Sequence, residues 1–360
     1  MHTVIIDTAR PDLRDNIRFI FDTFGVNLRD KLVLVKPNII GVFPIEQGVT
    51  TNPAVVRAVV DVLLEQGARV VVGDNPGGVE GNSFLTAQRV GIVDASRGCF
   101  TNISERVVTV PISSGVTDSV LVSKVLFEAD YFINLPKFKT HTLTTISGAI
   151  KNLYGLVAGS AKAMLHLKAK TSDRFCHLLV DINQLRPPDL SIMDALTVME
   201  GNGPSHGHSR PLGKLLASTN VAALDAVMVT MMGADPAQVE LLRVAAARGL
   251  GPIDLREIDI VGELQPIPNF QLPTTFTISV REQGQLLKEI GTVVPTVEEA
   301  ACITCGECET NCPPQAITMD PFPTIDKTKC ISCFCCTEMC PENAIKVPEV
   351  LYDLWDKALQ

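Results

Sequence analysis

Two copies of one cysteine pattern, close to the C-terminal end, constrain this chain more than any other feature. The first copy begins at Cys302 and the second begins 28 positions later at Cys330, and both have the spacing C-x2-C-x2-C-x3-C followed by proline. Two-residue gaps present three thiolates to one iron–sulfur cube, and this spacing is typical of proteins with two 4Fe–4S clusters. The repeat therefore predicts a domain for electron transfer.

This segment resembles the bacterial ferredoxins with two 4Fe–4S clusters, in which the last cysteine of each motif binds the other cluster. The expected ligands are Cys302, Cys305, Cys308 and Cys340 for cluster I, and Cys330, Cys333, Cys336 and Cys312 for cluster II. A zinc site or a set of disulfides is the alternative, but two full repeats, each closed by proline, favour the clusters. The extra Cys335 is expected to be an unligated thiol beside cluster II, and a role as an alternative ligand or a redox-active thiol stays open.

Charge and hydropathy restrict the partners and the location. The chain has a formal net charge of −9, and residues 296–347 contain eight acidic and three basic side chains. Such a surface repels nucleic acid and suits a basic patch on an external electron donor or acceptor. No apolar run is long enough to span a bilayer and no secretory signal is visible, so we expect no membrane span and a cytoplasmic location.

The alternation of strand-like and helix-like segments predicts the architecture of the remaining chain. An apolar strand at Lys31–Val35, an amphipathic helix at Pro53–Gln66 and a second strand at Ala68–Gly73 form a βαβ unit with parallel strands. We therefore expect an α/β fold, with a two-lobed, mostly parallel body at residues 1–290. A ferredoxin-like α+β domain with two 4Fe–4S clusters should occupy residues 296–347, followed by a C-terminal helical tail at residues 348–360.

A basic segment without any acid is the main candidate for a ligand site. The 42 residues between Asp130 and Asp173 contain no Asp or Glu, and the segment begins at a predicted strand, Tyr131–Leu135. Open α/β sheets bind ligands at the carboxyl ends of their strands, and lysines there would hold an anion. The candidate catalytic residues are Lys137, Lys139, His141 and Lys151. The alternatives are a surface that docks the acidic ferredoxin domain and a solvated basic face.

Further polar residues follow other predicted strands. If the strands are parallel neighbours, Lys36 and Asp74 face the same crevice as Lys137, although turn chemistry also explains Asp74. Asp194, Glu200 and His208 fall near a Gly/Pro-rich loop that would bind a metal or move protons, but their spacing matches no known metal motif. The expected substrate-binding residues are Lys36, Asn38, Asp74, Thr140, Asn152, Asn202 and His206. The crevice is also a candidate site for a further organic cofactor. No phosphate-binding, dinucleotide-binding or serine-hydrolase motif is present.

Several segments resemble the family called domain of unknown function 362, over nearly all of residues 30–265. They are KPN at Lys36–Asn38, GARVVVGDNPGG at Gly67–Gly78, ADYFINLPKFKTH at Ala129–His141, SGAIKNLYG at Ser147–Gly155, MEGNGPSHG at Met199–Gly207 and ALDAV at Ala223–Val227. The resemblance implies an architecture more than an activity, and members of this family often carry the same C-terminal pair of cluster motifs. The family tends to have an aspartate where this chain has Asn220. A weaker similarity links KTH at Lys139–His141 and SGAIKN at Ser147–Asn152 to the nickel-pincer lactate racemases.

Together these observations predict an iron–sulfur redox protein, most simply a reductase. Two 4Fe–4S clusters would relay electrons to an anionic substrate or cofactor in a lysine-rich crevice of the α/β domain. The first alternative is a docking module that transfers electrons to a partner enzyme without chemistry of its own. The second is a non-redox body with structural or sensing clusters.

Overall fold

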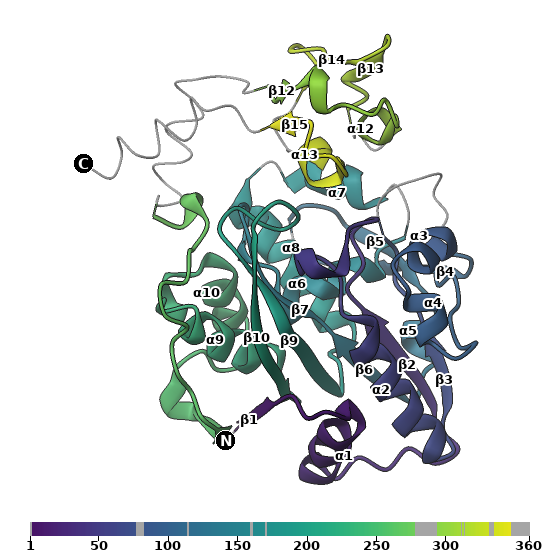
Figure 1. Cartoon of the computed structure of the whole chain (residues 1–360), viewed down its shortest axis with the longest axis vertical. Helices are drawn as coiled ribbons and strands as arrows, with labels where there is room; N and C mark the ends of the chain where they lie inside the picture. The colour runs from purple at the N-terminus through teal and green to yellow at the C-terminus, as the bar shows by residue number, and fades with distance from the viewer. Residues whose placement is uncertain are drawn as a thin grey trace.

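The computed structural model describes residues 2–76, 83–113, 115–158, 161–169, 171–277, 294–310, 312, 314–330 and 335–346. The predicted helical tail at residues 348–360 lies outside the described residues, as does the segment 278–293 between the two domains. The α/β body and the ferredoxin-like domain are separate units along the chain, and the second lies at one end of the first (Figure 1).

One nine-stranded sheet runs through the body. Its strands, in order across the sheet, are β11 (Ile258–Gly262), β1 (His2–Thr8), β10 (His208–Ser218), β9 (Leu190–Glu200), β6 (Tyr131–Leu135), β2 (Leu32–Pro37) and β3 (Arg69–Val72). In addition, β7 (Lys137–His141) pairs with β9, and β8 (Thr145–Ile146) pairs with β7. Strand β10 is antiparallel to both β1 and β9, and the pairs β1–β11, β9–β6, β6–β2 and β2–β3 are parallel. The predicted mostly parallel sheet is confirmed, as is the βαβ unit built on β2 and β3.

Helices cover both faces of this sheet (Figure 1). Alternate residues of β2 enter opposite cores: Val33 and Val35 pack with helices α1 (Leu13–Phe24) and α2 (Pro53–Glu65), whereas Leu34 packs with α8 (Ser172–Leu185), α9 (Val221–Met231) and α10 (Glu240–Ala247). This alternation follows from the two-residue period of a strand, and it explains why the strands read as continuous apolar runs. The shorter helices are α3 (Ser83–Arg89), α4 (Ile92–Ala95), α5 (Val125–Glu128), α6 (Gly148–Asn152) and α7 (Ala161–Ala169), and a separate hairpin joins β4 (Val107–Pro111) to β5 (Ser119–Ser123).

Capping side chains set the beginnings of the main helices. Asn52 accepts a hydrogen bond from the N–H of Ala54, with Pro53 in the first turn of α2. Asn220 accepts one from the N–H of Ala223 at 2.9 Å and so caps α9. Asn220 is therefore an uncharged cap of α9.

Pro136 separates two consecutive strands that both lie beside β9. Strands β6 and β7 both pair with β9 in parallel, and Pro136 separates them because it has no N–H to donate. Its carbonyl still accepts a hydrogen bond from the N–H of Asp194 at 2.9 Å. Lys137, Lys139 and His141 thus lie on a second strand, β7, which begins just after the carboxyl end of β6.

The ferredoxin-like domain repeats one small unit twice. The first half contains α12 (Glu307–Thr310) and β13 (Ile317–Met319), and the second half contains α13 (Cys335–Met339) and β15 (Ile345–Lys346). Strand β13 pairs with β14 (Pro323–Ile325), and β15 pairs with β12 (Thr296–Val297), both antiparallel. Single-turn 3-10 helices lie at Ile45–Gln47, Leu153–Leu156, Pro236–Gln238, Leu255–Glu257, Thr274–Thr277 and Glu299–Ala301.

Candidate functional site

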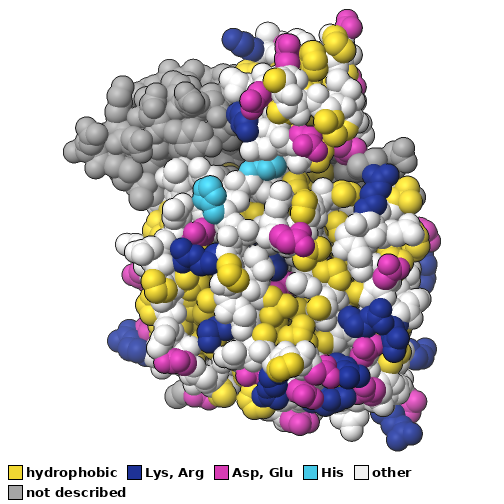
Figure 2. All heavy atoms as spheres, in the orientation of Figure 1, with side chains coloured by type: hydrophobic (Ala, Val, Ile, Leu, Met, Phe, Trp, Pro, Cys, Tyr) yellow, Lys and Arg dark blue, Asp and Glu magenta, His cyan; other side chains and the backbone are white. Residues whose placement is uncertain are grey.

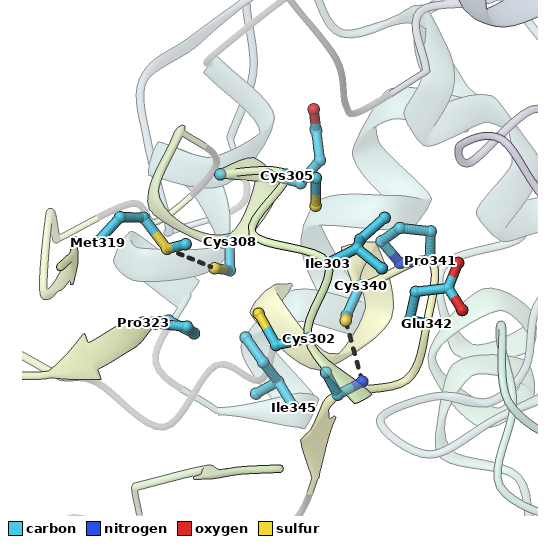
Figure 3. A pocket seen from close by; sticks show the side chains of 13 residues that line it. Cys302, Ile303, Cys305, Cys308, Met319, Pro323, Cys340, Pro341, Glu342 and Ile345 are labelled. Carbon is cyan, nitrogen blue, oxygen red and sulfur yellow. Dashed lines mark hydrogen bonds between the residues drawn. The ribbon is translucent and has the colours of Figure 1, made fainter. Parts of the chain in front are cut away.

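Four cysteines surround one cavity in the ferredoxin-like domain. Cys302, Cys305 and Cys308 reach it from the first motif, and Cys340 reaches it from the second (Figure 3). The apolar side chains of Ile303, Pro323, Pro341 and Ile345 also line it. This set of thiols is the one that the crossed ligand pattern predicts for cluster I, and its apolar surroundings would limit the access of water to a bound cluster.

Backbone N–H groups point at the cysteine sulfurs in both halves of this domain. The N–H of Ala316 donates to Cys312 Sγ at 3.2 Å, and that of Ala344 donates to Cys340 Sγ at 3.1 Å. The preceding residues, Gln315 and Asn343, have left-handed φ values of 51° and 50°, so the same turn forms twice. Such hydrogen bonds stabilise negative charge on a cluster and its thiolates. The residues therefore fit 4Fe–4S clusters.

The alternatives to clusters find no support in the described ranges. The nine cysteines described there are free thiols. No three His, Cys, Asp or Glu side chains among the described residues are grouped as a single metal ion requires. A zinc ion gathers its ligands around one point, whereas a cube holds each thiolate at a separate corner. Of the predicted ligands of cluster II, Cys312, Cys330 and Cys336 are described, whereas Cys333 and the Cys335 side chain lie outside the described part.

In the body, Lys36 and Asp74 form a buried ion pair. Lys36 Nζ lies 2.7 Å from Asp74 Oδ1, and their side chains are 0% and 2% exposed. The ammonium also donates to the Pro37 carbonyl at 2.9 Å and to Asn152 Oδ1 at 3.3 Å. Burial lowers the pKa of Lys36, and Asp74 opposes that effect. A Cβ on Gly155 would lie 2.1 Å from Asp74 Oδ1, so this close approach requires glycine.

The predicted catalytic lysines on β7 are buried and bonded to protein oxygens. Lys137 Nζ lies 2.6 Å from Asp194 Oδ2, and neither side chain is exposed. Asp194 comes from β9, the neighbour of β7, and accepts two further backbone N–H groups, those of Asn52 and Leu196. Lys139 Nζ donates to the Val49 carbonyl at 2.6 Å. Thr140 is also buried, and its hydroxyl lies 3.5 Å from the Met199 carbonyl.

A second group of cations centres on Lys151. Burial, followed by the charges of Lys151 and Lys139, holds the pKa of His141 well below its usual value. Burial also lowers the pKa of Lys162 to about 8, with Lys36 and Lys151 adding to this effect and Asp74 opposing it. The pKa of His166 falls to about 3 through burial and the charges of Lys151 and Lys162. Three basic side chains, those of His141, Lys162 and His166, are therefore subject to the charge of Lys151, and Asp74 acts on one of them, Lys162.

Lys162 and His166 were not among the predicted site residues. Both lie on α7, and Lys162 Nζ donates to the carbonyl of Asn75, next to Asp74. The His166 ring stacks on Phe175 with centroids 4.2 Å apart. Their sequence signal was the acid-free segment, but the residues selected from it ended at Asn152, before α7 begins.

The remaining predicted residues lie apart from this group or support it. Asn38 donates to Asn152 Oδ1 at 3.0 Å and thereby extends the network of Lys36. Asn202 Oδ1 accepts hydrogen bonds from the backbone N–H and the hydroxyl of Thr274, so it anchors the segment that follows β11. His206 Nε2 donates to the carbonyl of Thr337 in the ferredoxin-like domain at 2.9 Å.

The carboxylates near these residues form ion pairs and hydrogen bonds within the protein. Glu200 lies 3.4 Å from Arg210, and Asp194 is held by Lys137, so the proposed metal-binding loop does not gather its carboxylates. Asp225 accepts the N–H groups of Ala149 and Ile150 at the start of α6, and burial raises its pKa to about 7. Within the described ranges no helix is long and apolar enough to cross a membrane.

Comparison with known proteins agrees with both parts of the architecture. The 4Fe–4S dicluster domain matches residues 301–349, which makes the C-terminal region a ferredoxin-type iron–sulfur domain. The family described as domain of unknown function (DUF362) matches residues 33–230. The chain belongs to the DUF362 family.

One curated protein and one solved structure are similar to parts of the chain. The thylakoid-associated protein sll1697 of Synechocystis sp. is 35% identical over 230 residues, which are 61% of this chain and 68% of the relative. The lactate racemase apoprotein from Thermoanaerobacterium thermosaccharolyticum superposes with a TM-score of 0.38 and 11% identity, covering 62% of this chain and 55% of that one. At this TM-score the likeness supports no inference about activity.

Proposed function

We propose that this chain passes electrons from two 4Fe–4S clusters to an anionic substrate or cofactor held beside Lys151. The observation that carries the proposal is the contact between the two domains. His206 follows β9 at its carboxyl end and binds Thr337, so the ferredoxin-like domain lies at the edge of the sheet where β2, β6 and β9 end. Ligands of open α/β sheets bind at this edge. Helix α7, which carries Lys162 and His166, faces the same domain (Figure 1).

The charge of the Lys151 group favours an anion. Lys162, His141 and His166 all have lowered pKa values, in part because the cations lie close to one another. A bound carboxylate or phosphate would offset this mutual repulsion and the loss of solvation. Lys36, Lys137 and Lys139 are fully buried and bonded to protein oxygens, and we propose that they hold the shape of the site. Lys162 also donates to a protein oxygen, the Asn75 carbonyl, but it is only half-buried, and we propose that it contacts the ligand.

The titrating groups suggest distinct roles in a reduction. When bound, the two clusters would supply two electrons, one each, taken from an external electron carrier, and the acceptor would take them up with two protons, one from Lys162 and one from solvent. Lys162 has a pKa of about 8 and is therefore protonated at neutral pH, yet it releases a proton easily. His141 and His166 are neutral at that pH, so they would orient the ligand and not act as acids.

The external carrier would dock on the outer side of the ferredoxin-like domain. The loop Cys302–Gly306 is largely exposed there, and Ile303 is 59% exposed. Exposed acidic residues of this domain include Glu298, Glu309 and Glu342. A basic patch on the carrier would complement them. A cytoplasmic location remains part of this proposal.

The test is an anaerobic preparation of the full chain, examined by EPR, iron and sulfide analysis, and mass spectrometry of released small molecules. We expect eight irons for two cubes, about four each, reduction by dithionite, and an anionic compound released on denaturation. Lys151→Met and Lys162→Met should lose this compound and keep both cluster signals. Lys168→Met, which changes an exposed lysine on the same helix α7, should keep it.

A second candidate function is an electron-transfer module without chemistry of its own. It is favoured by the buried bonds of Lys36, Lys137 and Lys139, whose ammonium groups are already bound to the protein. Release of no compound from any variant, together with co-purification of a redox enzyme, would favour this module. Clusters that dithionite cannot reduce would contradict both functions.

A further inference from the structure

The two halves of the ferredoxin-like domain differ in their contact with the body. In the second half, the carbonyl of Thr337 on α13 accepts the hydrogen bond from His206, and the Thr337 side chain is buried. The Met339 methyl also approaches Gly41 of the body, since a Cβ built on Gly41 would lie 4.0 Å from it. In Figure 1, α13 lies against the body while α12 and the β13–β14 hairpin lie away from it.

The corresponding residue of the first half faces solvent. Glu309 stands 28 positions before Thr337 and follows Cys308 as Thr337 follows Cys336. It is exposed, and its carboxylate accepts the N–H of Met319 within its own domain. The body therefore distinguishes two halves that share the same chain path. The residue it contacts is covalently next to Cys336, a predicted ligand of cluster II.

His206 is held in a fixed position. Its ring packs edge-on against Phe43 with centroids 6.0 Å apart, and Phe43 is buried with Val49 and Met199. The loop around it is closed tightly, because a Cβ on Gly207 would lie 2.3 Å from the Glu200 carbonyl. The acceptor is a carbonyl, so Nε2 must carry the proton and donate it. Histidine side chains are visible at the junction of the two domains in Figure 2.

We infer that His206 is a positioning residue that tunes cluster II, and not cluster I, through the peptide of Thr337. This inference rests on the proposed electron transfer and adds the element that couples the body to one cluster. The His206 N–H offsets the partial negative charge of a carbonyl that lies one residue from Cys336, and less negative surroundings favour the reduced, more negative state of a cluster. Loss of this donor should therefore make cluster II harder to reduce. The contact also makes α13 the side of the domain that faces the acceptor.

The experiment is an EPR-monitored redox titration of the full chain with both clusters loaded. His206→Phe keeps an aromatic ring against Phe43 but has no N–H, His206→Gln keeps an N–H donor, and His208→Phe changes an exposed histidine nearby. Cys305→Ser and Cys333→Ser, each made in the natural background, identify the signals of clusters I and II. We expect His206→Phe to lower the midpoint potential of cluster II alone. His206→Gln should restore much of it, and His208→Phe should change neither potential.

The outcomes separate this inference from the proposed function. A shift of cluster I, an equal shift of both clusters, or no shift in His206→Phe overturns the role of His206 and leaves the electron transfer standing. Failure of His206→Gln to recover the potential, with His206→Phe folded, also overturns it, because the N–H would then be irrelevant. If neither cluster of the natural protein can be reduced, the proposed function itself fails.

Discussion

The buried pair of Lys137 and Asp194 provides the sharpest test of how the lysine-rich edge is built. We consider Asp194→Asn, which keeps the shape of the side chain and removes its charge. The carboxylate accepts Lys137 Nζ at 2.6 Å, the Asn52 N–H at 2.7 Å and the Leu196 N–H at 2.9 Å. An amide has one oxygen, so its NH₂ group would face at least one of these donors. Lys137 would then keep a buried charge without a counter-ion.

The size of the effect follows from the burial of both partners. Removal of one partner of a buried ion pair destabilises a protein by about 3–5 kcal/mol. The control is Glu65→Gln: Glu65 lies 2.8 Å from Arg18, and the two side chains are 45% and 44% exposed. An exposed pair of this kind contributes about 0–1 kcal/mol. The double variant Lys137→Met with Asp194→Leu removes both charges and should recover most of the lost stability.

The assay is urea unfolding under anaerobic conditions, with two signals recorded on one sample. Far-UV circular dichroism follows the helix-rich body, and visible iron–sulfur absorbance follows the ferredoxin-like domain. We expect the body midpoint of Asp194→Asn to fall on the order of 1 M urea, given the usual dependence of unfolding free energy on urea. The cluster signal should still disappear at its natural midpoint, unless the two domains unfold together.

One result would refute this reasoning. If Asp194→Asn and Glu65→Gln shift the midpoint equally, Lys137 does not depend on its carboxylate. Lys137 would then be available to an anionic ligand, as the sequence alone suggested. The same result would weaken the proposal that Lys151 and Lys162, and not the β7 lysines, contact that ligand.

Three further predictions concern the same region. Lys162 is charged below its pKa of about 8 and neutral above it, so the affinity for sulfate, measured by calorimetry, should fall between about pH 7 and about pH 9. The variant Lys162→Met should lose this pH dependence. An equal pH dependence in both proteins would contradict the prediction. Gly155→Ala places a methyl group 2.1 Å from Asp74 Oδ1 and should reduce the free energy of unfolding by about 1–3 kcal/mol. An unchanged urea midpoint would argue against the close packing of Gly155 on the Lys36–Asp74 ion pair. The pKa of Asp225 is raised from 3.8 to about 7, so between these values the folded protein binds a proton that the unfolded chain has released. The contribution of Asp225 to stability therefore declines as the pH rises from about 4 to about 7. The variant Asp225→Asn should show a weaker dependence of the urea midpoint on pH in that range.

Local patterns of the sequence predicted the elements that are fixed by local rules. The helix expected at Pro53–Gln66 is found at Pro53–Glu65, because Asn52 and Pro53 define its start whatever surrounds it. The strands around it are parallel neighbours, as the βαβ pattern required. The prediction that Lys36 and Asp74 face one crevice also depended on this parallel pairing. The structure shows the two side chains as a buried ion pair, with Lys36 Nζ 2.7 Å from Asp74 Oδ1.

The pattern could not reveal which lysines are bonded within the protein. Lys137 meets Asp194, which is 57 positions away in sequence and lies on a strand that pairs with β7 only after Pro136 interrupts the chain. The acid-free segment gave no indication of this partner, because the carboxylate of Asp194 lies outside that segment in the sequence. Lys162 was not predicted as a site residue because it lies on a helix, α7, that comes after the predicted strand ends along the chain. The fold places this helix so that Lys162 lies near Asp74.

Internal duplication gives the ferredoxin-like domain two equivalent halves, and a single imidazole–carbonyl contact makes them unequal. Because the body donates a hydrogen bond to the main-chain oxygen of Thr337, the backbone path of the second copy is constrained more strongly than its side-chain identity. The first copy is not constrained in this way at Glu309, whose side chain is exposed. The two copies should therefore diverge unevenly among related chains. The first would change its surface to suit new carriers, while the second would conserve the geometry of its helix.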